Sequence, residues 1–256
     1  MAMPKSEKFL RDLSVVIPTY NEAENIGPLI LKIEKIFQHH GINGEIIIVD
    51  DNSPDGTADV VKRYLGKFDN IRILERKAKL GLGYAYKEGF RAVNGRIVME
   101  MDADFSHDPS DIPRIFEKCI KESDVVIGSR YVRGGRIVGW NFTRRMVSFL
   151  ANMLVDIFLR LRVKDNTAGF RAYRREALEA ILPNVKCNSY DFQVEMLLKA
   201  KEKGLTIKEI PVVFRERMRG KSKLGRKEIL KFVKMLLDEA LFSNKRARKR
   251  NEFNNN

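Results

Sequence analysis

Short apolar runs rich in β-branched residues alternate along the chain with longer stretches in which apolar positions recur with a helical period. We expect strands at LSVVI (13–17), EIIIV (45–49), IRIL (71–74), RIVMEM (96–101), DVVIG (124–128) and IKEIPVVF (207–214). We expect helices near 28–38, 57–66, 82–93, 110–121, 144–161, 190–203 and 226–242. This alternation predicts an α/β fold with a mostly parallel, twisted sheet flanked by helices.

Composition allows this pattern to fold as one unit. The chain has 256 residues, 44% of them hydrophobic, which is enough for the core of one large domain. No repeat, low-complexity stretch or linker rich in Pro, Gly and Ser interrupts the pattern before the tail. We predict an N-terminal extension over 1–12, one folded domain over 13–243, and a basic, disordered tail over 244–256.

Cysteine usage and the N-terminus indicate a cytoplasmic protein. Cys119 and Cys187 lie far apart and form no CxxC, so neither a disulfide framework nor a cysteine zinc site is expected. The first residues, MAMPKSEKFLRDL, lack the apolar region of a signal peptide. No stretch reaches the roughly 18 apolar residues that a membrane-spanning helix needs.

The net charge predicts an anionic partner. Lys and Arg number 48 and Asp and Glu 34, which gives a formal charge of +14. Such a chain attracts nucleic acid, a phosphorylated substrate or an anionic membrane surface, and charge alone does not choose among them. A nucleic-acid-binding module would leave the acidic clusters described next without a role, and the aromatic pattern of an RNA-recognition motif is absent. We therefore predict no nucleic-acid partner.

Polar clusters follow four of the predicted strands at the point where each strand ends. In an open parallel sheet, ligands bind in the crevice beyond the carboxyl ends of the strands. We therefore expect the four clusters to converge on one site. They are PTYNE (18–22), DDNSPDGT (50–57), DAD (102–104) and GSR (128–130).

The DAD cluster predicts a metal site. An extended backbone directs positions two apart to the same side, so Asp102 and Asp104 can face one ligand together. Two carboxylates that close repel each other unless a cation or a hydrogen-bond donor intervenes. Mg²⁺ and Mn²⁺ take oxygen ligands and commonly share them between one or two carboxylates and the phosphates of a substrate.

Other interpretations of this segment remain open. The acids could belong to a solvated turn, and Ser106 or Asp108 before Pro109 could start the next helix. A glycosidase pair is disfavoured, because its carboxyls must lie at least about 5 Å apart on either side of a sugar bond. His107 has no nearby His or Cys, and we interpret it as a surface or capping residue.

The DDNSPDGT cluster has two interpretations as well. Asp50 and Asp51 could accept hydrogen bonds from a base or a ribose hydroxyl, and Thr57 could cap the helix that follows. The segment could equally be an ordinary turn between a strand and a helix, since Pro54 and Gly56 form a turn signal.

Seven segments in this order resemble the inverting glycosyltransferases of family 2, and most closely the dolichyl-phosphate mannose synthases. The resemblance runs from about residue 13 to residue 242, and the QxxRW signature of processive polysaccharide synthases is absent. The segments are VVIPTYNE, IIIVDDNSPDGT, LGLG (80–83), MDADFSHDP, IGSRY, NTAGFRAYRR and RMRGKSKLGRKEI.

The resemblance implies a GT-A fold, GDP-mannose as the donor, a dolichyl or other polyprenyl phosphate as the acceptor, and Mg²⁺ or Mn²⁺ as the cofactor. Asp104 and Arg130 match catalytic positions, and Asp104 and Ser106, with Asp102, match the metal site. The positions that match donor-binding residues are Pro18, Tyr20, Glu22, Val49, Asp51, Asp102, Ala103, Arg130, Arg217 and Lys223.

A phosphate acceptor changes what the protein must supply. A phosphate monoester has a second pKa of about 6 and is mostly dianionic at pH 7, so it needs no general base. Arginine suits the task of positioning it, and we assign Arg144 and Ser148 to the acceptor phosphate because positions i and i+4 share a helix face.

The same predicted helix carries an apolar stripe that could contact a membrane, although such stripes are more often core. We expect the protein to act peripherally on the cytosolic face of a membrane, with a small membrane-anchoring subunit as a further candidate partner. The stripe comprises Phe149, Leu150, Met153, Leu154, Ile157, Phe158 and Leu161.

Two enzymatic alternatives remain. A polyprenyl-phosphate glucosyltransferase that uses UDP-glucose would have the same scaffold. A transferase that acts on a sugar hydroxyl would require a base, for which Glu195 is the candidate.

Overall fold

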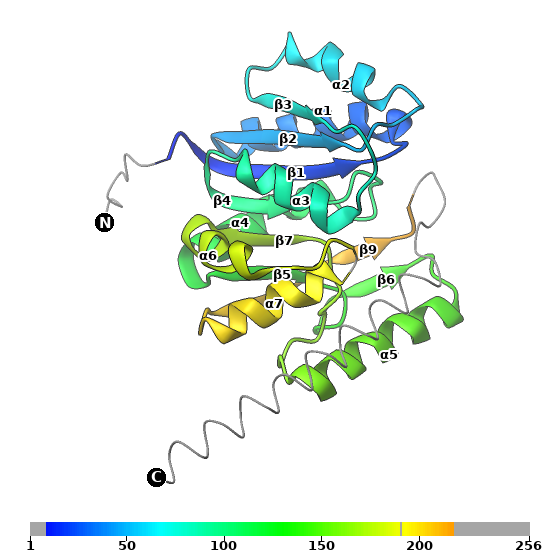
Figure 1. Cartoon of the computed structure of the whole chain (residues 1–256), viewed down its shortest axis with the longest axis vertical. Helices are drawn as coiled ribbons and strands as arrows, with labels where there is room; N and C mark the ends of the chain where they lie inside the picture. Colours follow the sequence, from blue (N-terminus) through cyan, green and yellow to red (C-terminus); the bar gives the residue numbers. More distant parts are fainter. Residues whose placement is uncertain (1–8, 190, 218–256) are drawn as a thin grey trace.

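The structure is a computed structural model that describes residues 9–189 and 191–217. Within these residues a seven-stranded sheet has the order β3-β2-β1-β4-β7-β5-β8 (Figure 1). Its pairs are parallel except those of β7, which lies antiparallel between β4 and β5. The predicted α/β fold with a mostly parallel sheet is confirmed. The strands are β1 (Arg11–Thr19), β2 (Gly44–Asp50), β3 (Ile71–Glu75), β4 (Gly95–Glu100), β5 (Val125–Ser129), β7 (Arg171–Arg174) and β8 (Ile207–Pro211).

Helices cover both faces of this sheet, and the strands alternate their side chains between the two layers. In β1, Val15 and Ile17 face one core and Val16 faces the other, as the two-residue period of a strand requires. One face packs against α1 (Ala23–His40), α2 (Thr57–Leu65) and α4 (Ile112–Glu122). The other packs against α3 (Leu82–Arg91), α6 (Arg175–Ile181), α7 (Phe192–Glu202) and part of α5 (Phe142–Leu159).

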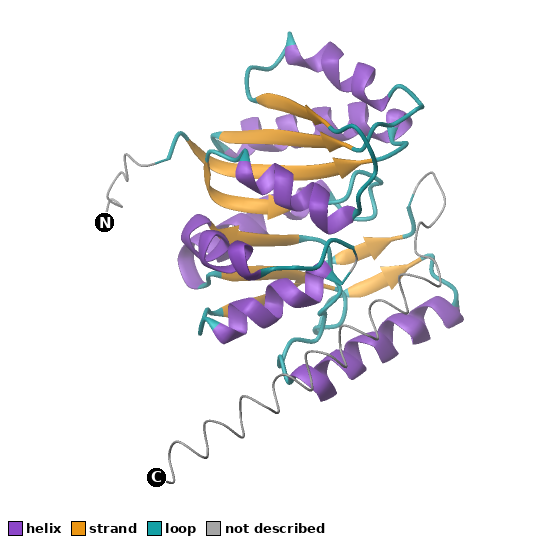
Figure 2. Cartoon of the chain, in the orientation of Figure 1, coloured by secondary structure: helices purple, strands orange, loops and turns teal. Residues whose placement is uncertain are grey.

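A two-stranded parallel ribbon lies to one side of the main sheet, next to α5 (Figure 2). It consists of β6 (Arg136–Val138) and β9 (Val213–Arg215). The single strand predicted over 207–214 is therefore wrong: β8 ends at Pro211, and the chain changes sheets at Val212. The imide nitrogen of Pro211 carries no hydrogen, which favours ending the ladder there. Val212 then donates to the carbonyl of Ser129 and accepts from the amide of Arg136.

Strand order places the site at the carboxyl edge between β1 and β4. From β1 the chain proceeds outward through β2 to β3, and it then returns to place β4 on the opposite side of β1. This reversal is the topological switch point at which open α/β sheets bind ligands. PTYNE follows β1 and DAD follows β4, so the order of the strands brings these two clusters together.

Three predictions lie outside the described residues: the helix over 226–242, the tail over 244–256 and the site residue Lys223. The predicted extension over 1–12 is described only from residue 9, and β1 already begins at Arg11. The division into extension, domain and tail therefore stays a prediction.

Candidate active site

The metal-binding residues of the prediction lie on the tight loop that follows β4. The backbone reverses at Phe105, whose φ is 60°, and Asp104 Oδ1 accepts a hydrogen bond of 3.0 Å from the amide of Ser106. Asp104 and Ser106 are both buried. The Ser106 Oγ is buried without a hydrogen-bond partner among the described residues, a state that is rare for a polar atom.

Negative charge accumulates on this loop. Asp102 keeps 36% of its side-chain surface exposed, yet the protein packed around its carboxyl displaces enough water to raise its pKa to about 7. The charge of Asp104 raises this pKa further, and those of Glu100 and Glu22 act in the same direction. Arg217 opposes them, with its Nε 3.4 Å from Asp104 Oδ2. The loop is therefore short of positive charge.

The donors of the loop fit a hard divalent cation. Two carboxylates and a hydroxyl offer oxygen ligands only, as Mg²⁺ and Mn²⁺ prefer, and the unpartnered Ser106 Oγ is available as one of them. No group of three His, Cys, Asp or Glu residues that could hold a metal occurs in the described part of the chain. An ion held by Asp102 and Asp104 would thus take further ligands from a substrate or from water.

His107 is not the surface or capping residue that we predicted. It is 3% exposed and stacks on Phe170 at 5.0 Å, with Phe214 against its edge at 5.3 Å. Burial lowers the pKa of its imidazole to about 4, so the ring is neutral. Its Nδ1 accepts the amide of Asp102 at 3.4 Å. The sequence did not indicate this role, because both aromatic partners lie far along the chain, Phe170 just before β7 and Phe214 in β9.

The end of this segment does start a helical turn, as the alternative interpretation with Asp108 expected. Asp108 accepts a hydrogen bond of 3.1 Å from the amide of Ser110 and so caps a short 3₁₀ turn over Pro109–Asp111. Capping by Asp108 and a ligand site at Asp104 are therefore compatible, because different acids serve the two purposes.

Part of the predicted donor-binding set lies near the carboxyl ends of β1 and β2. Asp51 is buried and is held by Arg76, with Nη1 2.6 Å from Oδ1. Lys79 lies 4.1 Å above the ring of Tyr20, and Arg76 lies 4.6 Å above that of Tyr84. Of the other predicted residues, Glu22 acts on the carboxyl of Asp102, and Val49 and Ala103 are buried.

Sequence reasoning missed Arg76 and Lys79, although a signal for them exists. RKAK directly follows β3, and strand ends were the criterion that found the other clusters. Thr57 was interpreted wrongly as a cap. Its hydroxyl donates to Asp55 and accepts the amide of Glu22 at 3.0 Å, so it joins the turn after β2 to the start of α1.

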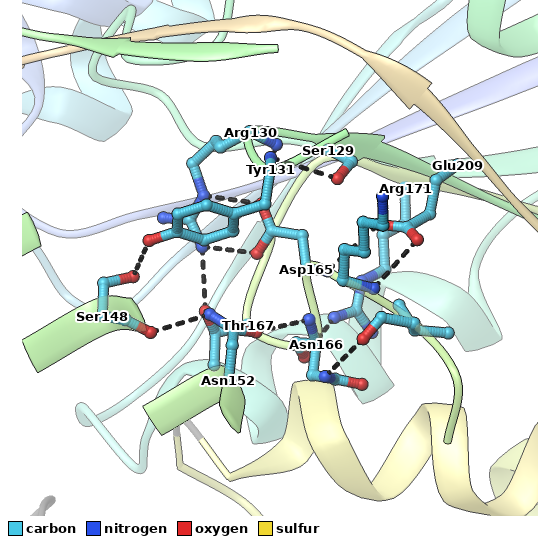
Figure 3. A network of polar contacts seen from close by, with 12 residues as sticks. Ser129, Arg130, Tyr131, Ser148, Asn152, Asp165, Asn166, Thr167, Arg171 and Glu209 are labelled. Carbon is cyan, nitrogen blue, oxygen red and sulfur yellow. Dashed lines mark hydrogen bonds and ion pairs between the residues drawn. The ribbon is translucent and has the colours of Figure 1, made fainter. Parts of the chain in front are cut away.

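Arg130 lies at the end of β5, in a buried network (Figure 3). Its Nε and Nη2 donate to the two carboxylate oxygens of Asp165 at 2.7 and 2.6 Å, and its amide donates to the same carboxylate at 2.9 Å. Nη2 also donates to the Thr167 hydroxyl at 2.8 Å. Two of the three guanidinium nitrogens are thus fixed by Asp165 and Thr167, neither of which we predicted.

The network continues into α5. Asn152 donates to Thr167 Oγ1 at 3.2 Å and accepts the amide of Asn166 at 2.6 Å (Figure 3). Ser148, one turn earlier, accepts a hydrogen bond of 2.8 Å from the Tyr131 hydroxyl. The residues around 165–169 therefore join α5 to the end of β5 through polar contacts.

Arg144 lies in the first turn of α5, where its side chain contacts a carboxylate and an aromatic ring. Its Nη1 lies 2.8 Å from Glu216 Oε1, its guanidinium carbon lies 4.1 Å from the ring centre of Trp140, and Asn141 caps the helix by accepting the Arg144 amide at 2.9 Å. Glu216 precedes Arg217, so two adjacent residues join Arg144 to the acidic loop. The structure places Arg144 near that loop, whereas the Ser148 hydroxyl faces Tyr131.

Glu195 does not suit the role of a general base. It is 3% exposed, and its Oε2 accepts the amides of Lys186 and Cys187 at 2.9 and 2.7 Å. The carboxylate thus fixes the loop before α7. The alternative of a sugar-hydroxyl acceptor activated by Glu195 is therefore not supported.

Comparison with known proteins places the chain in a family. The model of the family described as "Glycosyl transferase family 2" matches residues 14–182, which is more than half of the chain. The chain belongs to glycosyl transferase family 2. It is thus a glycosyltransferase.

Three relatives support this placement. An undecaprenyl-phosphate mannosyltransferase of Micrococcus luteus is 39% identical over 82% of this chain and 86% of its own length. A polyprenol monophosphomannose synthase of Mycolicibacterium smegmatis is 39% identical over 82% and 80%. A dolichol-phosphate mannosyltransferase of Pyrococcus furiosus is 38% identical over 87% of this chain, which spans only 62% of that protein.

Solved structures confirm the GT-A-like fold. Glucosyl-3-phosphoglycerate synthase from Mycobacterium tuberculosis, in complex with phosphoglyceric acid, matches with a TM-score of 0.70 and 21% identity over 90% of this chain and 80% of that one. The same enzyme in complex with Mn²⁺, UDP-glucose and phosphoglyceric acid matches with a TM-score of 0.69 and 20% identity, over 90% and 80%.

Proposed function

We propose that this glycosyltransferase transfers mannose from GDP-mannose to a polyprenyl phosphate such as dolichyl phosphate, with inversion and with the help of Mg²⁺ or Mn²⁺. The observation that carries the proposal is that an acidic loop and a group of arginines lie side by side at one edge of the sheet. Asp102 and Asp104 form an acidic loop, and Arg130, Arg144 and Arg217 lie beside it. The names of the three relatives give the acceptor and the sugar.

The acidic loop suits the leaving nucleotide. Asp102, Asp104 and Ser106 would hold the ion, which as a Lewis acid stabilises the charge of a departing diphosphate. Arg217 already balances Asp104 at 3.4 Å, and a guanidinium can exchange a carboxylate for a phosphate oxygen because both accept its planar fork of donors. Asp51 and Tyr20, at the ends of β2 and β1, are the proposed contacts of the nucleoside.

The basic side suits an acceptor that is itself an anion. A phosphate monoester needs no proton removed at neutral pH. The engagement of Glu195 with two backbone amides agrees with a site that does not use it as a base. Arg144 would exchange Glu216 for the acceptor phosphate, and Arg130, held by Asp165, would present a fixed positive charge nearby.

The surface of α5 supports peripheral contact with a membrane. No described helix is long and apolar enough to cross a bilayer. Only Val155 and Leu159 of the apolar residues on α5 are buried, and Leu161, included in the predicted stripe, lies beyond the helix and is buried as well. We propose that the exposed apolar side of α5 enters the cytosolic interface of the membrane, with or without a small anchoring subunit. Its exposed residues are Phe142, Met146, Val147, Phe149, Leu150, Met153, Leu154, Ile157 and Phe158.

A product assay tests the function. The chain is incubated with polyprenyl phosphate in detergent and with equal concentrations of GDP-mannose and UDP-glucose, and the lipid product is identified by mass and by anomeric configuration. We expect polyprenyl-phosphate mannose with the inverted configuration. A glucosylated lipid would support the UDP-glucose alternative instead, and retention of configuration would contradict the single displacement.

A pair of matched variants tests the acceptor site. Arg144→Ala should raise the KM for polyprenyl phosphate far more than the Kd for GDP-mannose. Arg145→Ala removes the same charge from the same helix turn, but this side chain donates to the carbonyl of Ile137 and should leave the KM nearly unchanged. Equal losses for donor and acceptor in Arg144→Ala would show that this residue is assigned wrongly.

A further inference from the structure

Trp140 lies close to both arginines of the proposed acceptor site, Arg130 and Arg144. The guanidinium carbon of Arg144 is 4.1 Å from the centre of its ring, and that of Arg130 is 5.6 Å away. Both distances fall within the range of cation–π attraction. One aromatic ring thus attracts two cations that repel each other, and it keeps both close to the same place.

The indole N–H of Trp140 is a donor without an acceptor. Its Nε1 is buried and has no hydrogen-bond partner among the described residues. Indole can only donate, and buried donors in native proteins almost always find a partner. An unsatisfied donor close to two guanidinium groups favours an anionic ligand, because one such ligand can accept a hydrogen bond from the indole and be attracted to both arginines.

The surrounding backbone fixes this ring. Gly139 has a φ of 89°, and a Cβ on it would come within 2.7 Å of the Glu216 Cβ, so only glycine allows the two segments to approach this closely. Glu216 donates its amide to the carbonyl of Val138 at 2.9 Å, just before this glycine. Phe214 packs edge-on against the indole at 5.3 Å. The ring is therefore held before any ligand arrives.

We propose that Trp140 is a binding residue for the acceptor phosphate: its Nε1–H donates to a phosphate oxygen while its ring holds Arg130 and Arg144 in position. This inference rests on the proposed function, because it takes the acceptor to be a prenyl phosphate bound at Arg144. It adds a neutral donor to a site whose other predicted phosphate ligand on the helix, Ser148, already accepts a hydrogen bond from Tyr131.

The composition of the chain gives a direct probe, because Trp140 is its only tryptophan. Polyprenyl phosphate dispersed in detergent is titrated into the full chain while the intrinsic fluorescence is recorded. We expect a saturable change in emission with the phosphate and none with the matching polyprenol, which has the same hydrocarbon chain. Inorganic phosphate tests whether the headgroup suffices. The same change with polyprenol would overturn the inference, since the ring would then be sensing hydrocarbon only.

Two substitutions separate the N–H from the ring. Trp140→Phe keeps an aromatic face for the arginines but lacks the donor, and Trp140→Leu lacks both. For Trp140→Phe we expect the KM for polyprenyl phosphate to rise about 10- to 100-fold, the range for one hydrogen bond to a charged group, with the Kd for GDP-mannose within about twofold of wild type. Trp140→Leu should raise the KM further.

The outcomes distinguish this inference from the function on which it rests. An active wild type together with an unchanged acceptor KM in Trp140→Phe would overturn the binding role alone. Equal losses of donor and acceptor binding, with a lowered unfolding temperature, would show that Trp140 only packs against Phe214, and this too would overturn it. A wild-type chain that transfers no sugar to any polyprenyl phosphate would overturn the proposed function itself.

Discussion

The ion pair between Arg130 and Asp165 should be one of the interactions on which the folded state depends most. The side chains are 7% and 0% exposed, and the carboxylate accepts three hydrogen bonds from Arg130. Removing one member of a buried pair typically costs about 3–5 kcal/mol, because the other charge stays buried without compensation. We therefore expect Asp165→Asn to lower the free energy of unfolding substantially.

The structure indicates where in this range the loss of unfolding free energy for Asp165→Asn should fall. Asn has nearly the volume of Asp, so no cavity forms, and one amide oxygen can still accept the two bonds now made to Oδ2, from the amide and Nε of Arg130. The bond from Nη2 to Oδ1 is replaced by a contact between two donors. We expect a loss of about 3 kcal/mol, at the lower end of the range for broken buried pairs.

Urea unfolding, followed by far-ultraviolet circular dichroism, measures this loss as a lower midpoint with an unchanged slope. Asp108→Asn is the matched control. Asp108 binds Lys32 at 2.8 Å, but the two side chains are 34% and 44% exposed, and Asn preserves the cap on Ser110. It should cost at most about 1 kcal/mol. If the two variants lost equal stability, burial would not be the reason for the strength of the Arg130–Asp165 pair.

Three further predictions concern the metal, pH and the membrane. Asp104→Asn should lower the rate of transfer about 100- to 1,000-fold while the unfolding midpoint changes little, and wild-type activity that survives a chelator would contradict the metal role behind it. Because the pKa of Asp102 is raised to about 7 from an ordinary 3.8, the metal-free folded protein holds a proton that the unfolded chain has lost. Its free energy of unfolding should therefore fall as pH rises from about 4 to about 7. Over the upper part of that range the binding of GDP with Mn²⁺, measured by calorimetry, should become stronger. A binding affinity that does not change with pH would show that Asp102 does not titrate there. If basic charge dominates membrane binding, sedimentation with anionic liposomes should weaken at high salt. If the apolar side of α5 dominates, sedimentation should be lost in a folded Phe149→Ser/Phe158→Ser variant. A wild-type chain that stays in the supernatant at low salt would contradict direct membrane contact.

The fold could be predicted largely because its signals are local. Strands such as β2, with seven consecutive buried positions, need no distant information to be recognised. The strand β7 escaped because its sequence, RAYR, begins and ends with arginine. Arg171 is fully buried there only because Gln193 and Asn166 supply carbonyl acceptors and Glu100 lies 3.6 Å from its Nε. None of these partners is close in sequence except Asn166.

The same difference between local signals and distant contacts separates the site residues that could be predicted from those that could not. Residues at the ends of strands, such as Asp104 and Arg130, could be proposed from the sequence because strand ends of a parallel sheet meet at one edge. Asp165 and Trp140 were missed, since their importance comes from what they contact. Asp165 meets Arg130 across 35 positions, and Trp140 meets Phe214 across the β6–β9 ribbon, which periodicity did not predict.

For helix α5, hydrophobic periodicity alone could not show whether the apolar stripe is buried or exposed. An apolar stripe is usually core, and by that rule Phe149, Ile157 and Phe158 should face the sheet. The structure instead buries Val155 and Leu159 on the inner side and leaves the stripe exposed, because Asn152 anchors the helix from that inner side by polar contacts with Thr167 and Asn166. The inner side of α5 is thus held by both apolar packing and hydrogen bonds, and its other apolar residues are exposed. The network around Arg130 therefore fixes one side chain of the proposed site and is joined to the helix that carries the proposed membrane surface.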